Sequence, residues 1–167
     1  MLVEQVVARY GKLDVLAHTV GGFAGGKPVS ETDDATFQAM FDVNLNSLFH
    51  ILRAAIPHLR RTLCGRMIAI GSRAAVEPGA GVGAYSASKA AMLSLIKTVA
   101  IENADAGLTA NVILPGTIDT ATNRKAMPNA DFSKWVQPEN VASLALWLAS
   151  DAGKEVTGAA IPIYGNS

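Results

Sequence analysis

The sequence predicts an α/β fold built on a parallel sheet, and three observations support this prediction. Apolar runs typical of buried strands alternate along the chain with longer segments of helical periodicity. The strand-like runs end in loops that contain glycine or proline, as at Gly71 and Pro115. We find no repeat, low-complexity tract or linker, so residues 1–167 are expected to form one domain. Strict alternation of this kind is typical of βαβ units with crossover helices.

The first half of the chain predicts two helices and a strand. Residues 2–10 have apolar side chains at helical spacing and stop at Gly11. Residues 13–17 form a short apolar run before the glycine-rich loop 21–28, which indicates a buried strand. The carboxylates of Asp33 and Asp34 suit the N-terminus of a long helix over 33–61. That helix is apolar on two faces, so we expect it to pack on the sheet and also on a partner.

The second half continues the alternation. Residues 66–71 predict a strand, and residues 84–103 predict a second long helix with two apolar faces. Residues 108–114 alternate into a third strand. A polar stretch at 118–137 leads to an amphipathic helix at 138–150, and residues 156–164 predict the last strand.

Composition excludes several classes of protein. Half of the residues are hydrophobic, 17% are charged and the formal net charge is +0, so neither a nucleic acid nor an anionic membrane surface is expected as a partner. We expect no membrane span, no signal peptide and no metal site. The single cysteine, Cys64, excludes an intrachain disulfide framework and favours a cytoplasmic location; we expect it to be a small buried or half-buried hydrophobe.

Tyr85 and Lys89 form the first candidate site. Their spacing puts both side chains on one face of a helix. A phenol has a pKa of about 10, and a nearby ammonium lowers that pKa, which suits acid–base chemistry on an alcohol or a carbonyl. Ser72 follows the strand at 66–71, where α/β sheets bind ligands, and its hydroxyl can bind the oxygen that Tyr85 protonates. Asn44 is polar inside a helix, whereas Asn46 is expected to face solvent.

These motifs resemble the short-chain dehydrogenase/reductase family in their order and spacing. The series reads LDVLAHTVGG, VNLNS, IGS, YSASK and LPGTIDT, and it covers essentially the whole chain. The resemblance implies a three-layer Rossmann-like parallel sheet, NAD or NADP as cofactor, and a small carbonyl or alcohol as substrate. The family's first three strands and glycine-rich turn have no counterpart here, so a truncated form of the fold is expected.

The resemblance also implies a role for each matching residue. Tyr85 would be the general acid/base, and Lys89 would lower its pKa and hold the nicotinamide ribose. Ser72 would orient the substrate carbonyl, and Asn44 would anchor a water that relays protons. The expected cofactor-binding residues are Gly21, Tyr85, Lys89, Pro115, Gly116, Ile118 and Thr120.

Two stretches depart from the family's pattern. His18 stands where the family has an asparagine that steadies the central strands, and we interpret it as a structural substitute. Residues 79–84 match the phosphate-binding pattern G-x-G-x-x-A as a string, but they are separated from their strand and no βαβ unit follows. We interpret them as the approach to Tyr85.

Residues 21–26 and 119–135 resemble loops of dihydropteridine reductases. The flat apolar side chains of Phe23 and Trp135 would then contact a planar substrate, and Arg73 is a third candidate for substrate binding. Those reductases do not keep the serine, so Ser72 favours a more ordinary carbonyl or alcohol. Pterin reduction is the minority alternative.

The leading hypothesis is therefore an NAD(P)-dependent oxidoreductase. The alternative is a truncated, catalytically silent chain that acts as a dimerisation or interaction module. In either case the strand at 13–17 has an unpaired edge, which we expect another chain or a rearrangement to cover. We expect a homodimer or homotetramer through the helices at 33–61 and 84–103.

Overall fold

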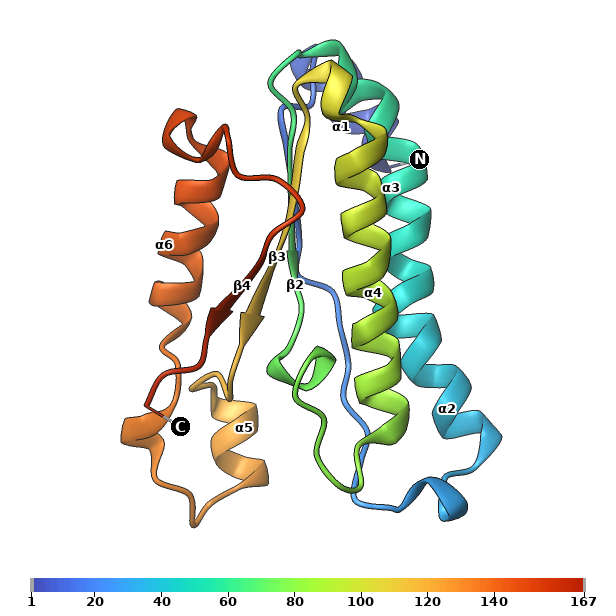
Figure 1. Ribbon diagram of the computed structural model, residues 1–167, viewed down its shortest axis with the longest axis vertical. Helices are drawn as coiled ribbons and strands as arrows, with labels where there is room; N and C mark the ends of the chain where they lie inside the picture. The colour runs from blue at the N-terminus through green and yellow to red at the C-terminus, as the bar shows by residue number, and fades with distance from the viewer. Residues whose placement is uncertain (1, 167) are drawn as a thin grey trace.

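The computed structural model describes residues 2–166, and it contains one sheet of four parallel strands in the order β1-β2-β3-β4 (Figure 1). Each strand pairs in parallel with its neighbour, so the predicted parallel α/β sheet is confirmed. The strands are β1 (Val15–His18), β2 (Arg66–Ile70), β3 (Thr109–Pro115) and β4 (Ala160–Ile163).

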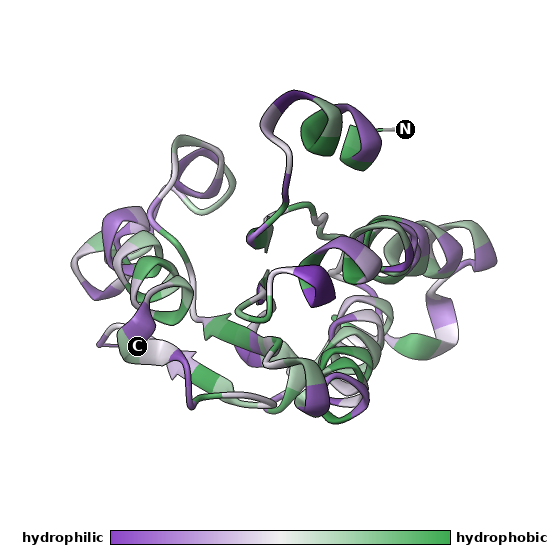
Figure 2. Ribbon diagram, turned by 90° about the horizontal axis from the view of Figure 1, so that it is seen from above, coloured by the Kyte–Doolittle hydropathy of each residue, from purple (hydrophilic) through white to green (hydrophobic). Residues whose placement is uncertain are grey.

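Helices cover both faces of this sheet. The helices α3 and α4 pack on one face and α6 packs on the other, which gives three layers (Figure 1). Viewed from above, the strands are mostly hydrophobic and lie between the helical layers (Figure 2). The helices are α1 (Leu2–Tyr10), α2 (Asp34–Phe41), α3 (Ser47–Arg61), α4 (Gly83–Glu102), α5 (Ala121–Ala126) and α6 (Pro138–Ala149).

Two hydrophobic cores follow from the three layers, because successive side chains of a strand point to opposite faces. In β2, Met67 and Ala69 join the core beneath α3 and α4, while Ile68 joins the core beneath α6. Leu52 of α3 and Leu148 of α6 are almost fully buried in these two cores. The sheet is therefore buried on both sides over its central strands, as expected for parallel pairing.

The predicted helix over 33–61 is interrupted. A π-helical turn, Asp42–Asn46, separates α2 from α3, and Asn44 is 0% exposed within it. Asp33 begins α2 as expected, since its carboxylate accepts a hydrogen bond from the Thr36 amide at 2.8 Å. Single π-helical turns inside α-helices occur frequently at functional sites, because the wider turn re-aims a side chain.

Several sequence-based expectations differ from the structure. Cys64 is exposed, so the expectation that it is buried is wrong. It lies in the turn between α3 and β2, next to Leu63, which has a φ of 57°. The polar stretch 118–137 contains the short helix α5, and the last strand is shorter than predicted.

Within residues 2–166 no rearranged strand pairs with the free edge of β1, so one of the two expected ways of covering it is not found. β1 pairs with β2 alone, and Val15 is 40% exposed. Covering of this edge by another chain stays a prediction. None of the helices within residues 2–166 is both long and apolar enough to cross a membrane.

Candidate active site

The loops that follow β1, β2 and β3 meet at the carboxyl edge of the sheet and line one cavity of about 580 Å³. Parallel sheets bind ligands at this edge because all strands deliver their carboxyl ends to it. Ser72 comes from the loop after β2, Ile118 from the segment after β3, and Tyr85 from the first turn of α4. The structure thus brings together residues far apart in the sequence.

Tyr85 and Ser72 share this cavity and a hydrogen bond, which partly lowers the pKa of Tyr85. Burial is the larger effect, and it raises the pKa of the phenol above its usual value of 10.0. The net shift of the Tyr85 pKa is therefore upward, and the expectation that Lys89 lowers this pKa stays a prediction. Ser72 also accepts a hydrogen bond from the Ala74 amide at 3.2 Å, which orients its side chain.

Lys89 lies one turn further along α4 and is 4% exposed. Its Nζ donates a hydrogen bond to the carbonyl oxygen of Ile70 at 3.2 Å. Burial lowers the pKa of Lys89 from 10.5 to about 8, because removal from water disfavours the charged form. The ammonium is held beneath the cavity, which Ile70 also lines.

Asn44 holds the glycine loop, which we define as residues 21–26. Its Oδ1 accepts a hydrogen bond from the Gly22 amide at 3.0 Å, and its Nδ2 donates to the Gly22 carbonyl at 3.1 Å. Nδ2 also donates to Ser88 Oγ at 3.0 Å, which ties the π-helical turn to α4. The sequence did not predict this pairing, and the water-anchoring role of Asn44 stays a prediction.

Gly21 lies where the glycine loop passes closest to these buried groups. A Cβ atom at this position would lie 3.1 Å from Asn44 Oδ1 and 3.1 Å from Lys89 Nζ. The absence of a side chain therefore lets the loop approach both atoms. Gly21 itself does not line the large cavity.

Of the three predicted substrate-binding residues, the structure places two on the cavity. Phe23 is 66% exposed and meets the Tyr85 ring edge-on, with centroids 5.0 Å apart. Arg73 also lines the cavity, where it pairs with Glu77 at 2.7 Å and lies over the Tyr164 ring. Trp135 does not line it: it is only 9% exposed and packs against Phe132, and its role in substrate binding stays a prediction.

Three of the residues predicted to lie along the nicotinamide line the cavity, namely Pro115, Gly116 and Ile118. Thr120 does not, because its hydroxyl begins α5 by accepting a hydrogen bond from the Asn123 amide at 3.2 Å. Asn123 and Met127 line the cavity instead. Sequence reasoning missed both because it did not predict α5, which carries one and ends at the other.

His18 ends β1 and is 5% exposed. Its Nε2 has no hydrogen-bond partner among the described residues. Burial lowers the pKa of His18, and the charge of Lys89 lowers it further. The interpretation of His18 as a structural substitute stays a prediction.

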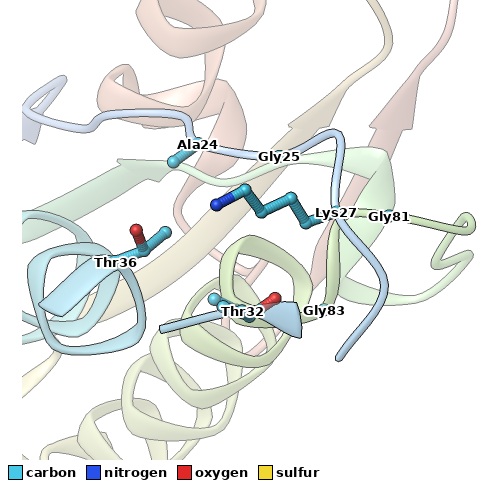
Figure 3. A pocket seen from close by; sticks show the side chains of 8 residues that line it. Ala24, Gly25, Lys27, Thr32, Thr36, Gly81 and Gly83 are labelled. Carbon is cyan, nitrogen blue, oxygen red and sulfur yellow. The ribbon is translucent and has the colours of Figure 1, made fainter. Parts of the chain in front are cut away.

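A second, smaller pocket of about 140 Å³ lies between the glycine loop and the start of α4. Figure 3 shows Lys27 extending across it toward Thr36. Gly81 and Gly83, from the stretch 79–84, form part of its wall. Gly81 is tied to the glycine loop, since its carbonyl accepts a hydrogen bond from the Gly26 amide at 2.8 Å.

The hydroxyl groups in this pocket already donate hydrogen bonds to other groups of the chain. Thr32 donates to the Pro28 carbonyl at 3.0 Å, and Thr36 donates to the Asp33 carboxylate at 3.1 Å. Neither proton is therefore available to an anion. We assign no ligand to this pocket.

Comparisons with known proteins agree with this arrangement. A family profile described as Enoyl-(Acyl carrier protein) reductase matches residues 1–165. The 4-formylbenzenesulfonate dehydrogenase of Comamonas testosteroni is 30% identical over 177 residues, which cover 98% of this chain and 70% of that protein.

Two solved structures have the same fold. A structure described as ElxO with NADP bound has a TM-score of 0.91 at 26% identity, covering 98% of this chain and 71% of that one. A short-chain type dehydrogenase/reductase from Mycobacterium ulcerans has a TM-score of 0.93 at 28% identity, covering 99% of this chain and 64% of that one. The profile match, the sequence relative and the shared fold together show that this chain belongs to the short-chain dehydrogenase/reductase family.

Proposed function

We propose that this chain is an NAD(P)-dependent oxidoreductase that acts on a small carbonyl/alcohol pair, with Tyr85 as its general acid/base. One observation carries the proposal: the side chains of Tyr85 and Ser72 line the same cavity at the carboxyl edge of the sheet. Lys89 lies one helical turn away, buried and near its ionisation point at neutral pH. A general acid near a polar orienting group suits proton transfer to an oxygen.

In the reducing direction, the Tyr85 hydroxyl donates its proton to the substrate oxygen as that oxygen becomes an alcohol. The Ser72 hydroxyl orients the same oxygen, since it already bonds the phenol. Burial raises the pKa of Tyr85, so the phenol stays protonated and ready to donate at neutral pH. The nicotinamide, when bound, supplies the hydride that reaches the carbonyl carbon. In the oxidising direction, Tyr85 takes the proton back.

The residues present fit the nicotinamide end of such a cofactor. Backbone from residues 115–118 forms one wall of the cavity, and Tyr85 lies on it as well. Gly116 brings this wall close to the segment after β4, since a Cβ there would lie 2.8 Å from the Tyr164 carbonyl. The residues proposed to hold the nicotinamide and its ribose are Gly21, Tyr85, Lys89, Pro115, Gly116, Ile118 and Thr120, whose hydroxyl accepts a hydrogen bond at the start of α5 and can still donate one.

A binding titration tests the proposal. Purified protein is titrated with NADH and NADPH to millimolar concentration, and nicotinamide fluorescence and thermal stability are followed. We expect a saturable change that Lys89→Met weakens and Lys97→Met, an exposed position on the same helix, leaves unchanged. A flat titration with both cofactors overturns the enzyme proposal for this chain and favours the alternative, an interaction module.

We also propose a homodimer or homotetramer through the outer faces of α2, α3 and α4. Large apolar side chains remain exposed there: Phe37 is 47%, Phe49 is 44% and Ile101 is 79% exposed. Exposed apolar patches of this kind mark interaction sites. Analytical ultracentrifugation should find an oligomer that Phe49→Asp dissociates; a wild-type monomer would contradict the proposal.

A further inference from the structure

The last side chain of β1 is a buried histidine, one of whose ring nitrogens has no hydrogen-bond partner among the described residues. His18 pairs with Ala69 in the sheet register, and its side chain lies on the same face as Leu16, which packs against the core beneath α3 and α4. It is 5% exposed, so its imidazole is in the protein interior. A buried polar group without a partner is unfavourable, so it calls for an explanation.

The unused atom is Nε2. It has no hydrogen-bond partner among the described residues, although it is fully shielded from solvent. Burial, the main cause, and the charge of Lys89 both lower the pKa of His18, so the ring is neutral at physiological pH. A neutral imidazole with its proton on Nδ1 presents Nε2 as a hydrogen-bond acceptor.

Lys89 is the complementary group. Its ammonium has three N–H donors, of which one is used by the Ile70 carbonyl at 3.2 Å. It is 4% exposed, and it is the charged side chain that acts on His18. The residue paired with His18 on β2, Ala69, carries no titratable group.

We propose that His18 is a positioning residue for Lys89: its Nε2 accepts a hydrogen bond from the buried ammonium through one bridging water. Buried waters commonly link two polar groups that would otherwise be unsatisfied. The bridge fixes the ammonium against the glycine loop, where Gly21 leaves room for it. This inference rests on the proposed function only in that it assigns Lys89 to the reaction; the contact itself needs no cofactor.

The first test follows the imidazole of His18 by NMR during a pH titration. Removing the Lys89 charge with Lys89→Met should raise the pKa of His18 by on the order of one unit, the size of effect that one nearby charge produces. Lys97→Met, an exposed position on the same helix, should leave it unchanged. The proposal is overturned if the pKa of His18 is the same in Lys89→Met as in the wild type.

The second test follows the titration of Lys89 itself. His18→Leu removes the acceptor and should lower the pKa of Lys89 further, whereas His18→Gln keeps an acceptor and should restore most of the wild-type value. If His18 had only a structural role, both variants would change the free energy of unfolding, but neither would change the pKa of Lys89. If His18→Leu does not fold, the proposal is still tested by comparing the pKa of His18 in the wild type with that in Lys89→Met.

These outcomes separate the two proposals. If neither NADH nor NADPH binds, the proposed function is refuted, but the coupling of His18 and Lys89 is not affected. A pKa of Lys89 that does not move in folded His18→Leu would sink the coupling and leave the proposed function standing.

Discussion

Replacing Asn44 by alanine tests whether the π-helical turn holds the glycine loop in place. The substitution removes the hydrogen bonds to the Gly22 amide, the Gly22 carbonyl and Ser88 Oγ, at 3.0, 3.1 and 3.0 Å. A typical intramolecular hydrogen bond contributes about 1 kcal/mol net, so the three together predict a loss of about 3 kcal/mol in the free energy of unfolding. For a chain of this size, that loss lowers Tm by roughly 6–12 °C.

The matched control is Asn46→Ala in the same π-helical turn. Asn46 makes one exposed hydrogen bond, to Asp42 at 2.7 Å, so its removal should lower the free energy of unfolding by less than about 1 kcal/mol. Urea unfolding of both variants measures the difference. The exchange rate of the Gly22 amide hydrogen provides a local reading, since that amide donates to Asn44.

Two results would refute this reasoning. Equal losses of stability in Asn44→Ala and Asn46→Ala would mean that the three bonds do not hold the loop. Unchanged protection of the Gly22 amide in Asn44→Ala would mean that another group satisfies that amide.

Three further predictions concern the groups around the cavity. In any preparation that turns over, Tyr85→Phe should lower kcat by about 10²–10⁴-fold with an unchanged circular dichroism spectrum, and retained turnover would reassign the general acid. Gly21→Ala should lower the free energy of unfolding by about 1–3 kcal/mol, because the added Cβ would crowd Asn44 and Lys89. The control Gly79→Ala should have little effect, because the nearest atom to its Cβ would be 3.9 Å away. Equal effects of the two substitutions would contradict the close approach at Gly21. Burial lowers the pKa of Lys89 from 10.5 to about 8, so the unfolded chain binds more protons between those values and wild-type stability should rise with pH across that window. Lys89→Met should abolish that rise and be more stable than wild type at pH 7 by on the order of 3 kcal/mol, and parallel stability curves for the two proteins would argue against a buried ammonium.

Much of the fold could be predicted from the sequence because its signals are local. The helices at 2–10 and 138–150 and the strand at 66–71 were predicted nearly to the residue, since apolar spacing and end signals act over a few positions. The break in the helix at 33–61 was not predicted. A π-helical turn depends on what its side chains meet, and Asn44 meets a loop 22 positions earlier in the chain.

The candidate site divides in the same way. The sequence was enough to place Tyr85 and Lys89 on one face of a helix, because residues four apart in a helix share a face. It was also enough to place Ser72 at a ligand-binding edge, because Ser72 follows a strand of a parallel sheet. Trp135 and Thr120 were assigned to the cavity by resemblance, and the structure places neither on its wall. Trp135 is buried against Phe132, and the Thr120 hydroxyl is used at the start of α5.

The sequence by itself determined the order of parallel strands and helices, the family and the residues proposed for proton transfer, because periodicity and motif spacing are properties of short segments. Tertiary structure decided the electrostatics of those residues. Spacing predicted that Lys89 lowers the pKa of Tyr85, which stays a prediction. Burial, which spacing does not reveal, raises the pKa of the phenol and lowers that of the lysine. Ionisation depends on how far each group is removed from water and on which atoms it faces, and segments distant in the chain supply both.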